Sequence, residues 1–182
     1  PLLRADTVDR LIQQYRQDQQ LSNPPVMAIL SVTRDDPQGF GRIVRDASGH
    51  VVRVVEEVDC TPEQREIKEL NSGIYCFDAT WLWDHIDEIP VSPKGEYYLP
   101  DMVAIAVSHG REVITVVAPA EEVSGINNRI HLAEAEQLMR QRILDDHMLN
   151  GVTIIDLAST YIDAGIAIGI DSVILPGSIL QG

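Results

Sequence analysis

The side chains that most often carry catalysis or bind metals, histidine and cysteine, are scattered along this chain of 182 residues. Neither type forms a recognisable ligand motif, because the sequence holds no HExxH segment, no CxxC pair and no carboxylate cluster beside a histidine. We therefore interpret the histidines as surface or capping residues and the cysteines as reduced, cytosolic thiols. The residues concerned are His50, His85, His109, His131, His147, Cys60 and Cys76.

General motifs for nucleotides and nucleophiles are also absent from the sequence. It contains no GxxxxGK[ST] phosphate loop, no GxGxxG turn between a strand and a helix, and no GxSxG nucleophile elbow. Judged by these motifs alone, the chain is an acidic α/β domain without a defined activity.

The charge of the chain excludes two classes of partner. Fourteen basic and 28 acidic residues give a formal net charge of −14 at pH 7. A surface of this sign repels the nucleic-acid backbone and anionic membranes, and no apolar run approaches the ~20 residues that cross a bilayer. We therefore expect neither nucleic acid nor membrane as a partner. A small anionic ligand requires a metal ion or backbone N–H groups to neutralise it.

Short apolar strands alternate with helices over the first 128 residues, which is typical of an α/β domain with a mainly parallel or mixed sheet. The first helix has Asp6 and Thr7 as N-cap candidates. A second helix should begin at Thr61, where Pro62 follows and Gln64 completes a capping box. The expected strands are 26–33, 42–45, 51–55, 73–77 and 113–117, and further helices are expected at 80–86 and 100–109.

The last part of the chain has a different character. Residues 129–150 are highly charged and favour a helix with a narrow apolar stripe, as in helices that bridge two domains. Beyond Gly151, aliphatic side chains recur every six residues, which is typical of a β-helix built from hexapeptides. These side chains are Ile162, Ile168, Ile174 and Leu180. Because the sequence starts without an initiator Met and stops within this period, we expect an internal fragment of a longer protein.

Five segments with a fixed order and separation carry a family resemblance. They are 39–45 (GFGRIVR), 55–59 (VEEVD), 69–75 (ELNSGIY), 95–101 (GEYYLPD) and 125–129 (GINNR). With the charged helix and the hexapeptide tail, the whole chain resembles the bacterial bifunctional N-acetylglucosamine-1-phosphate uridylyltransferase / glucosamine-1-phosphate N-acetyltransferase.

This resemblance implies an α/β fold in three parts. Residues 1–128 would be the C-terminal part of a Rossmann-like nucleotide-diphospho-sugar transferase domain, truncated at its N-terminus. Residues 129–150 would be the connecting α-helix, and residues 151–182 the first coil of a left-handed parallel β-helix that belongs to the acetyltransferase domain.

The resemblance also implies an activity for the intact protein. The family joins UTP to N-acetylglucosamine 1-phosphate with Mg²⁺, releasing pyrophosphate and forming UDP-N-acetylglucosamine for cell-wall synthesis. Its second domain acetylates glucosamine 1-phosphate with acetyl-CoA. We therefore expect a cytoplasmic homotrimer with these small molecules as its substrates and no catalytic side chain within the 182 residues.

Four residues match sugar-binding positions of the family. Gly41 would let the backbone approach the acetamido group, and Glu56 would accept hydrogen bonds from sugar hydroxyls. Asn71 can donate and accept at once, and Asn127 would bind the sugar nucleotide and offer its amide oxygen to Mg²⁺. All four are expected to bind UDP-N-acetylglucosamine, and Asn127 is also the expected metal ligand.

Each of the four has a structural alternative. Gly41 could relieve a bulge, Glu56 could be a solvated strand end, Asn71 could end the helix that begins at Thr61, and Asn127 could cap the long helix. The ordered set favours the sugar site. Glu96 and Tyr98 are expected at the wall of the pocket or just behind it.

Two positions depart from the family pattern. Val58 stands where the family usually has Lys, and Pro100 replaces a hydroxyl residue before Asp101. By the same resemblance, the nucleotide loop and the Asp that shares Mg²⁺ precede Pro1, and the acetyl-transfer residues follow Gly182. We therefore expect the 182 residues alone to be inactive.

Two other functions stay open. One is a non-catalytic regulatory or interaction protein on the same nucleotidyltransferase-plus-β-helix scaffold. The other is a related sugar-1-phosphate nucleotidyltransferase that uses another sugar.

Overall fold

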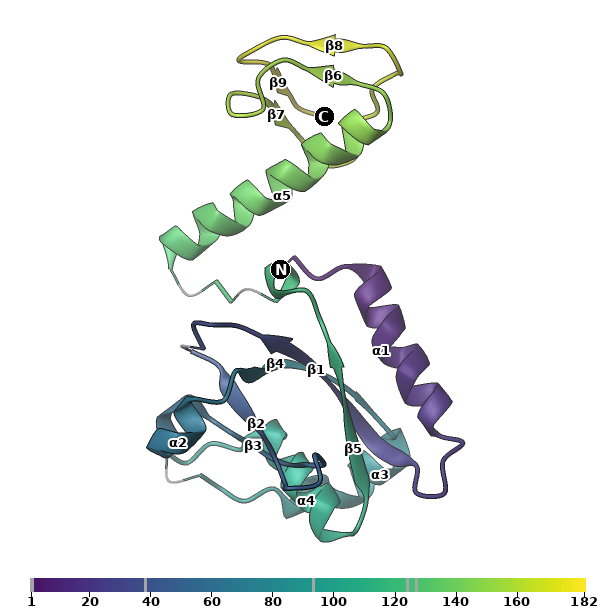
Figure 1. Cartoon of the computed structure of the whole chain (residues 1–182), viewed down its shortest axis with the longest axis vertical. Helices are drawn as coiled ribbons and strands as arrows, with labels where there is room; N and C mark the ends of the chain where they lie inside the picture. Colours follow the sequence, from purple (N-terminus) through teal and green to yellow (C-terminus); the bar gives the residue numbers. More distant parts are fainter. Residues whose placement is uncertain (1, 38, 93, 124, 127) are drawn as a thin grey trace. The chain divides into compact units, whose positions relative to one another are not determined.

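The computed structural model describes residues 2–37, 39–92, 94–123, 125–126 and 128–182. These residues form two compact units, one of Leu3–Val123 and one of Leu2 with the described residues from 125 onward (Figure 1). The larger unit is a mixed α/β fold. The smaller unit holds both the residues predicted as a connecting helix, 129–150, and those predicted as the tail, 151–182.

Every strand and helix expected in the first 123 residues is present in the larger unit. In chain order its elements are α1 (Ala5–Asp18), β1 (Pro25–Thr33), β2 (Gly41–Arg45), β3 (Val51–Val55), η1 (Glu57–Asp59), α2 (Pro62–Arg65), β4 (Glu69–Phe77), α3 (Ala79–His85), η2 (Ile86–Glu88), η3 (Leu99–Asp101), α4 (Met102–Ser108), β5 (Glu112–Val117) and η4 (Ala120–Glu122). The main difference is β4, which begins at Glu69 rather than at residue 73.

A five-stranded mixed sheet in the order β3-β2-β4-β1-β5 forms the centre of this unit. Strand β1 runs antiparallel to β4 and parallel to β5. All but the last of its nine residues are buried, because helices cover both faces of the sheet. Its side chains alternate between two cores, with Met27 and Ile29 in one and Ala28 and Leu30 in the other.

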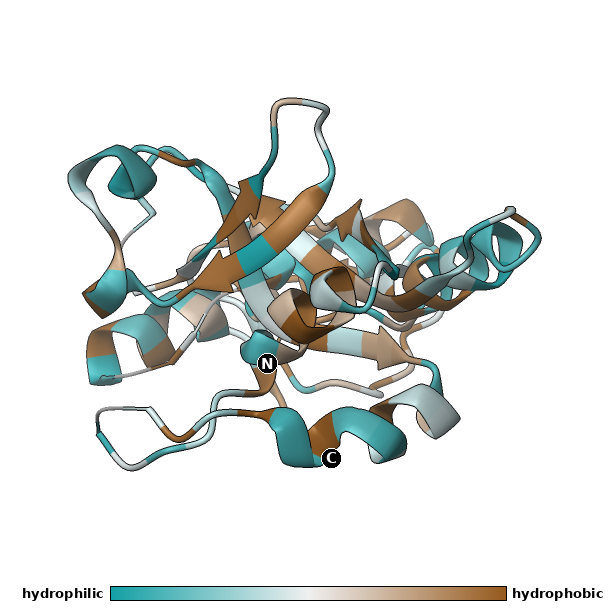
Figure 2. Cartoon of the chain, turned by 90° about the horizontal axis from the view of Figure 1, so that it is seen from below, coloured by the Kyte–Doolittle hydropathy of each residue, from teal (hydrophilic) through white to brown (hydrophobic). Residues whose placement is uncertain are grey.

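Helices on the two faces complete these cores. On one face, α1 packs through Leu11 and Tyr15. On the other, Trp81 of α3 and Met102 and Val103 of α4 pack against the sheet. Figure 1 shows α1 apart from α3 and α4 across the sheet, and Figure 2 shows hydrophobic residues concentrated along the strands. The sheet thereby lies between helices on both of its faces.

The start of α1 corrects one prediction. The helix begins at Ala5 with Arg4 as its N-cap residue, so Asp6 and Thr7 lie inside it rather than capping it. A tertiary contact accounts for the earlier start, because the Arg4 backbone N–H donates to Glu122 Oε2 at 3.1 Å. The shift buries Thr7, whose hydroxyl accepts from Arg10.

The start of α2 follows its local sequence. Thr61 Oγ1 accepts from the Gln64 backbone N–H at 3.3 Å, and the Thr61 backbone N–H donates to Gln64 Oε1 at 3.0 Å. This is the predicted capping box, with Pro62 in the first turn. The helix ends at Arg65, so the alternative role of Asn71 as its C-cap is wrong, and Asn71 lies within β4 instead.

The smaller unit joins the long helix α5 (Arg129–Leu149) to four short strands. Asn128 is the N-cap of α5 and its side chain accepts from the His131 backbone N–H at 2.9 Å. Only Ala135 and Leu144 of this helix are buried, as its polar sequence predicts. The strands are β6 (Thr153–Ile154), β7 (Tyr161–Ile162), β8 (Val173–Ile174) and β9 (Ile179–Leu180).

These strands pair in parallel, β6 with β8 and β7 with β9. Thr153 pairs with Val173 and Tyr161 with Ile179, spacings of 20 and 18 residues, or about three hexapeptides. The six-residue aliphatic positions are buried or half-buried, whereas Tyr161, Val173 and Ile179 are exposed. The predicted period therefore marks the inward-facing side chains. Among the described residues, no helix is long and apolar enough to span a membrane.

Candidate functional site

Three of the four predicted site residues meet where β2, β3 and β4 adjoin. Gly41 is the first residue of β2 and pairs with Asn71 of β4. Glu56 directly follows β3, and Arg42 pairs with Val55 in the β2–β3 ladder, so Glu56 lies beside Gly41. A Cβ atom on Gly41 would lie 3.4 Å from Glu56 Oε1. The structure thus brings a carboxylate, an amide and a position without a side chain together.

A bulge in β4 fixes the side chain of Asn71. Strand β1 pairs Leu30 with Ile74 but Ser31 with Asn71, so Ser72 and Gly73 are left out of the ladder. Gly73 has a φ of 78°, a left-handed conformation that glycine adopts readily. Its backbone N–H donates to Asn71 Oδ1 at 3.1 Å. Bulges often re-aim a side chain next to a functional site, and this one sets the orientation of the amide.

Tyr75 extends the site beyond the predicted residues. Asn71 Nδ2 donates to the Tyr75 hydroxyl at 2.8 Å, which leaves the phenol proton free to donate to another acceptor. Burial raises the pKa of Tyr75 to about 12, the hydrogen bond from Asn71 lowers it, and the charge of Glu56 raises it further. The phenol is therefore neutral at pH 7. Tyr75 is the last residue of the segment 69–75. The sequence pattern predicted no role for it.

Carboxylates gather around Glu56. Burial raises the pKa of Glu56, and the charges of Asp59 and Asp101 raise it further. Burial and the charge of Asp59 likewise raise the pKa of Asp101. These groups repel one another, and Glu56 and Asp101 are half-buried, so they favour a ligand that brings hydroxyl or N–H donors, or a cation. Sequence separation hid this cluster, because Asp101 is far from Glu56 along the chain.

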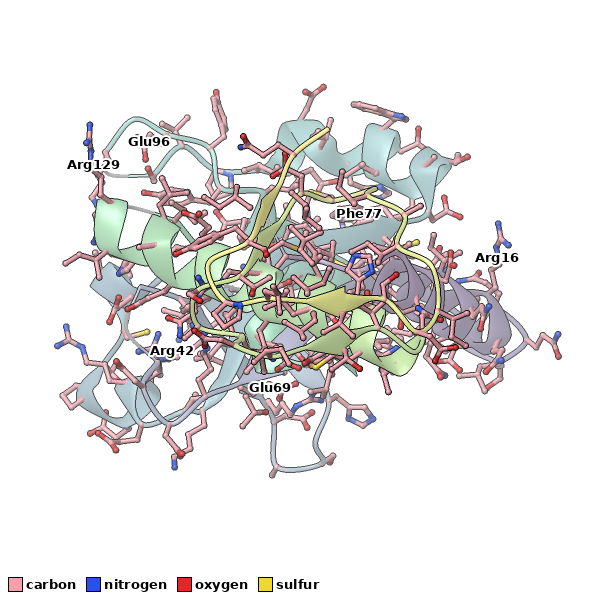
Figure 3. All side chains as sticks on the ribbon, turned by 90° about the horizontal axis from the view of Figure 1, so that it is seen from above. Arg16, Arg42, Glu69, Phe77, Glu96 and Arg129 are labelled. Carbon is pink, nitrogen blue, oxygen red and sulfur yellow. The ribbon has the colours of Figure 1, made fainter. Side chains whose placement is uncertain are left out.

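An ion pair between buried Arg42 and half-buried Glu57 positions the loop that carries Gly41. Arg42 is 1% exposed, and its guanidinium lies 3.7 Å from Glu57 Oε1 and donates to the Phe40 carbonyl. Glu57 also accepts from the Gly39 backbone N–H. These contacts tie the loop before β2 to the turn after β3, and therefore hold Gly41 beside Glu56. Arg42 is labelled in Figure 3.

Cys60 supports the same turn. Its thiol donates to the Glu56 carbonyl at 3.4 Å and lies 3.7 Å from the Val55 carbonyl. Both cysteines are free, and Cys60 is buried, so burial raises its thiol pKa. The thiol helps to shape the backbone at Glu56 and stays protonated.

The other predicted residues are not brought together with these three. Asn127, the predicted metal ligand, lies outside the described residues, and the cap of α5 is its neighbour Asn128. Glu96 is exposed and its carboxylate accepts from the Tyr98 hydroxyl at 3.2 Å; Figure 3 shows Glu96 at the periphery in that view. Val58, where the family usually has Lys, is 62% exposed.

The interpretation of the histidines as surface or capping residues fits His85, the last residue of α3, and His109, the exposed C-cap of α4. His85 and His109 lie in contact, with ring centroids 4.7 Å apart, and Glu88 lies beside them. Sequence separation concealed this group, because α4 and its flanking loops intervene between Glu88 and His109.

Comparison with known proteins finds relatives along the whole chain. No family model matches the sequence. The protein named bifunctional protein GlmU matches over 183 residues at 48% identity in Caldanaerobacter subterraneus subsp. tengcongensis and at 42% in Clostridium botulinum. The same-named protein of Geobacillus sp. matches at 45%. Each match covers 100% of this chain and 39% of the relative, so the chain spans about two fifths of their length.

Solved structures give more distant likenesses. CMP:2-keto-3-deoxy-manno-octonic acid synthetase aligns with a TM-score of 0.49 and 17% identity, over 78% of this chain and 58% of that chain. A putative glucose-1-phosphate thymidylyltransferase from Bacillus anthracis aligns with a TM-score of 0.45 and 17% identity, over 62% of this chain and 41% of that chain. The resemblance inferred from the five segments is confirmed by the sequence relatives rather than by these structures.

Proposed function

We propose that this chain, which is homologous along its whole length to part of the bifunctional GlmU proteins, binds the N-acetylglucosamine 1-phosphate portion of a uridylyltransferase substrate. The observation that carries the proposal is the meeting of Gly41, Glu56 and Asn71 where β2, β3 and β4 adjoin. A carboxylate, an amide and an open backbone position suit a ligand that combines hydroxyl groups with an acetamido group.

Each side chain has bonding capacity left for such a ligand. Within the described part of the chain, the Glu56 carboxylate has no hydrogen-bond or ion-pair partner, so it can accept from two hydroxyls. Asn71 has one N–H and one lone pair remaining after its bonds to Tyr75 and Gly73. Gly41 leaves room for the acetamido group. The neutral Tyr75 phenol offers one further donor.

For the intact protein we propose uridylyl transfer from UTP to N-acetylglucosamine 1-phosphate. The phosphate oxygen of the sugar attacks the α-phosphorus of UTP, pyrophosphate leaves, and UDP-N-acetylglucosamine forms. Mg²⁺, when bound, supplies neutralisation of the phosphate charge. The amide oxygen of Asn127 is a donor of the kind that Mg²⁺ takes, but it is one of about six, so other ligands come from substrate and from other parts of the intact protein.

The 182-residue chain alone should not turn over, because its sequence holds no phosphate-cradling loop. We expect no UTP-dependent release of pyrophosphate from it, measured against an intact relative. Turnover at a rate near that of the relative would contradict this proposal.

For the tail we propose the start of a left-handed parallel β-helix that carries the acetyl-CoA-dependent acetylation of glucosamine 1-phosphate. The parallel pairing of β6 with β8 and β7 with β9, together with the inward aliphatic period, supports a coil of about three hexapeptides. By the same homology we propose a cytoplasmic homotrimer for the intact protein.

The sugar site can be tested by saturation-transfer NMR, observing the acetyl methyl of UDP-N-acetylglucosamine. We expect binding by the full 182-residue chain, and a loss of about tenfold or more in Glu56→Gln and Asn71→Ala, since each removes a bond to the ligand. Glu69→Gln is the matched control, because Glu69 is half-buried on the same strand as Asn71 and pairs with Arg45 instead.

The competing functions predict other results. Equal binding of glucose 1-phosphate and N-acetylglucosamine 1-phosphate would favour a nucleotidyltransferase for another sugar. Absence of any sugar-phosphate binding by the folded chain would favour the non-catalytic scaffold. Equal losses in Glu69→Gln and Glu56→Gln would also overturn the assignment of the site.

A further inference from the structure

Among the residues that the structure describes, His85, Glu88 and His109 bring three potential metal-ligand atoms within 4.8 Å of one another. His85 is the last residue of α3, Glu88 ends η2, and His109 is the C-cap of α4. His109 Nε2 lies 3.0 Å from Glu88 Oε2, and the two imidazole rings meet edge to face. None of the three belongs to the sugar site.

A second observation indicates that His85 is oriented for a ligand. Its Nδ1 lies 2.8 Å from the Trp81 carbonyl oxygen. A carbonyl only accepts hydrogen bonds, so Nδ1 carries the proton and Nε2 keeps its lone pair. This is the usual arrangement of a metal-bound histidine, whose second nitrogen donates to a carbonyl or carboxylate. The imidazole also stacks on the buried Trp81 ring, with centroids 4.7 Å apart and planes 18° apart.

The distances suit a small transition-metal ion after modest side-chain rotation. Zinc binds nitrogen and oxygen at ~2.0–2.2 Å, so ligand atoms around a tetrahedral ion are about 3.3 Å apart. The Glu88–His109 pair already meets this spacing, and both side chains are exposed enough to rotate toward His85. Two imidazoles and one carboxylate favour zinc over Mg²⁺, which prefers oxygen ligands.

We propose that His85, Glu88 and His109 bind one Zn²⁺-type cation, with a water molecule in the fourth position. The ion would join the end of α3 and η2 to the C-terminal end of α4. Asp101, at the other end of that helix, lies about 12 Å away along the helix axis. The site therefore acts as a stabilising clamp on the helical layer that packs under β3, separate from the sugar-binding residues. The net charge of −14 adds a general attraction for cations.

Isothermal titration of Zn²⁺ alone into the metal-free 182-residue chain tests this proposal. We expect one ion per chain, an unfolding midpoint that rises with Zn²⁺ concentration, and no comparable binding of Mg²⁺. His85→Gln, Glu88→Gln and His109→Gln should each weaken Zn²⁺ by about tenfold or more. Co²⁺ should give visible absorption bands of a four-coordinate site, and those bands should vanish in His85→Gln.

His50→Gln is the matched control, because His50 also lies beside a carboxylate, with Nδ1 3.4 Å from Asp46, but has no third ligand among the described residues. It should bind Zn²⁺ as the unsubstituted chain does. Far-UV circular dichroism of the metal-free variants checks that each is folded, and the exposed Glu88→Gln change is the mildest of the three. Absence of stoichiometric Zn²⁺ binding, or an equal loss in His50→Gln, would overturn the proposal.

Discussion

Replacing Gly41 with alanine separates a role in ligand binding from a role in folding. The new methyl group would lie 3.2 Å from Val54 Cγ1 and 3.4 Å from both Glu56 Oε1 and the Val55 carbonyl. Only the Val54 contact is tight, and a shift of a few tenths of an ångström relieves it. Gly41 is not among the residues with positive φ, so alanine meets no backbone strain there.

The magnitudes of the two effects differ. The tight contact costs about 1 kcal/mol or less, and the reduced freedom of the unfolded chain returns about 0.4–1 kcal/mol, so stability should change by less than about 1 kcal/mol. The methyl group occupies the space beside the Glu56 carboxylate, where the acetamido group is proposed to lie. We expect ligand affinity to fall at least tenfold, about 1.4 kcal/mol.

Two assays on the full chain measure these quantities. Urea unfolding followed by circular dichroism gives stability, and saturation-transfer NMR with UDP-N-acetylglucosamine gives affinity. Gly169→Ala is the control, because Gly169 has no positive φ and a Cβ there would lie 4.0 Å from its nearest neighbour, Ser172. Unchanged affinity in a folded Gly41→Ala chain would refute the close approach of ligand to this backbone.

Three further substitutions test the surroundings of the site. Glu57→Gln leaves Arg42 buried without a negative partner and should lower the free energy of unfolding by about 1–3 kcal/mol. This is less than for a fully buried pair, because Glu57 is 35% exposed. A change below about 0.5 kcal/mol would show that the pair is dispensable. Because the pKa of Glu56 is raised in the fold, the stability it contributes is present below its ordinary value of 4.5 and lost as pH rises through the raised value. Glu56→Gln should therefore be more stable at neutral pH and lose less stability across that window in urea titrations at stepped pH, and a parallel decline in both chains would contradict this. Thr61→Ala removes the side-chain acceptor of the capping box and should cost about 0.5–2 kcal/mol without altering ligand affinity; an affinity change would show that α2 contributes to the site.

Local signals predicted the elements well. The capping box at Thr61, the strands and the six-residue period of the tail each depend on neighbours within a few residues, and each is present. The predicted start of α1 was wrong because a distant residue, Glu122, accepts a hydrogen bond from the Arg4 backbone N–H. Local patterns cannot contain such a contact.

The site was only partly predictable for the same reason. A β2–β3 hairpin alone places Glu56 beside Gly41, because Arg42 pairs with Val55. Placing Asn71 opposite Gly41 needs the β2–β4 pairing, which no local pattern encodes, and only the family resemblance anticipated it. Asp101 approaches Glu56 through the packing of η3 and α4 on β3.

The raised pKa values of Glu56 and Asp101 bear on the choice between a binding site and a scaffold. Crowded, partly buried carboxylates destabilise a fold, and a protein selected only for its scaffold gains nothing from keeping them. A ligand that supplies hydroxyl donors relieves the same crowding. Neutralising Glu56 should therefore raise stability and lower affinity for the ligand. If Glu56→Gln raised stability and left sugar-phosphate binding intact, the carboxylate would be a structural flaw without function. If Glu56→Gln lowered both stability and affinity, the lost affinity would follow from damage to the fold, and Glu56 would serve folding alone. Only a gain in stability with a loss of affinity fits a residue retained for its ligand.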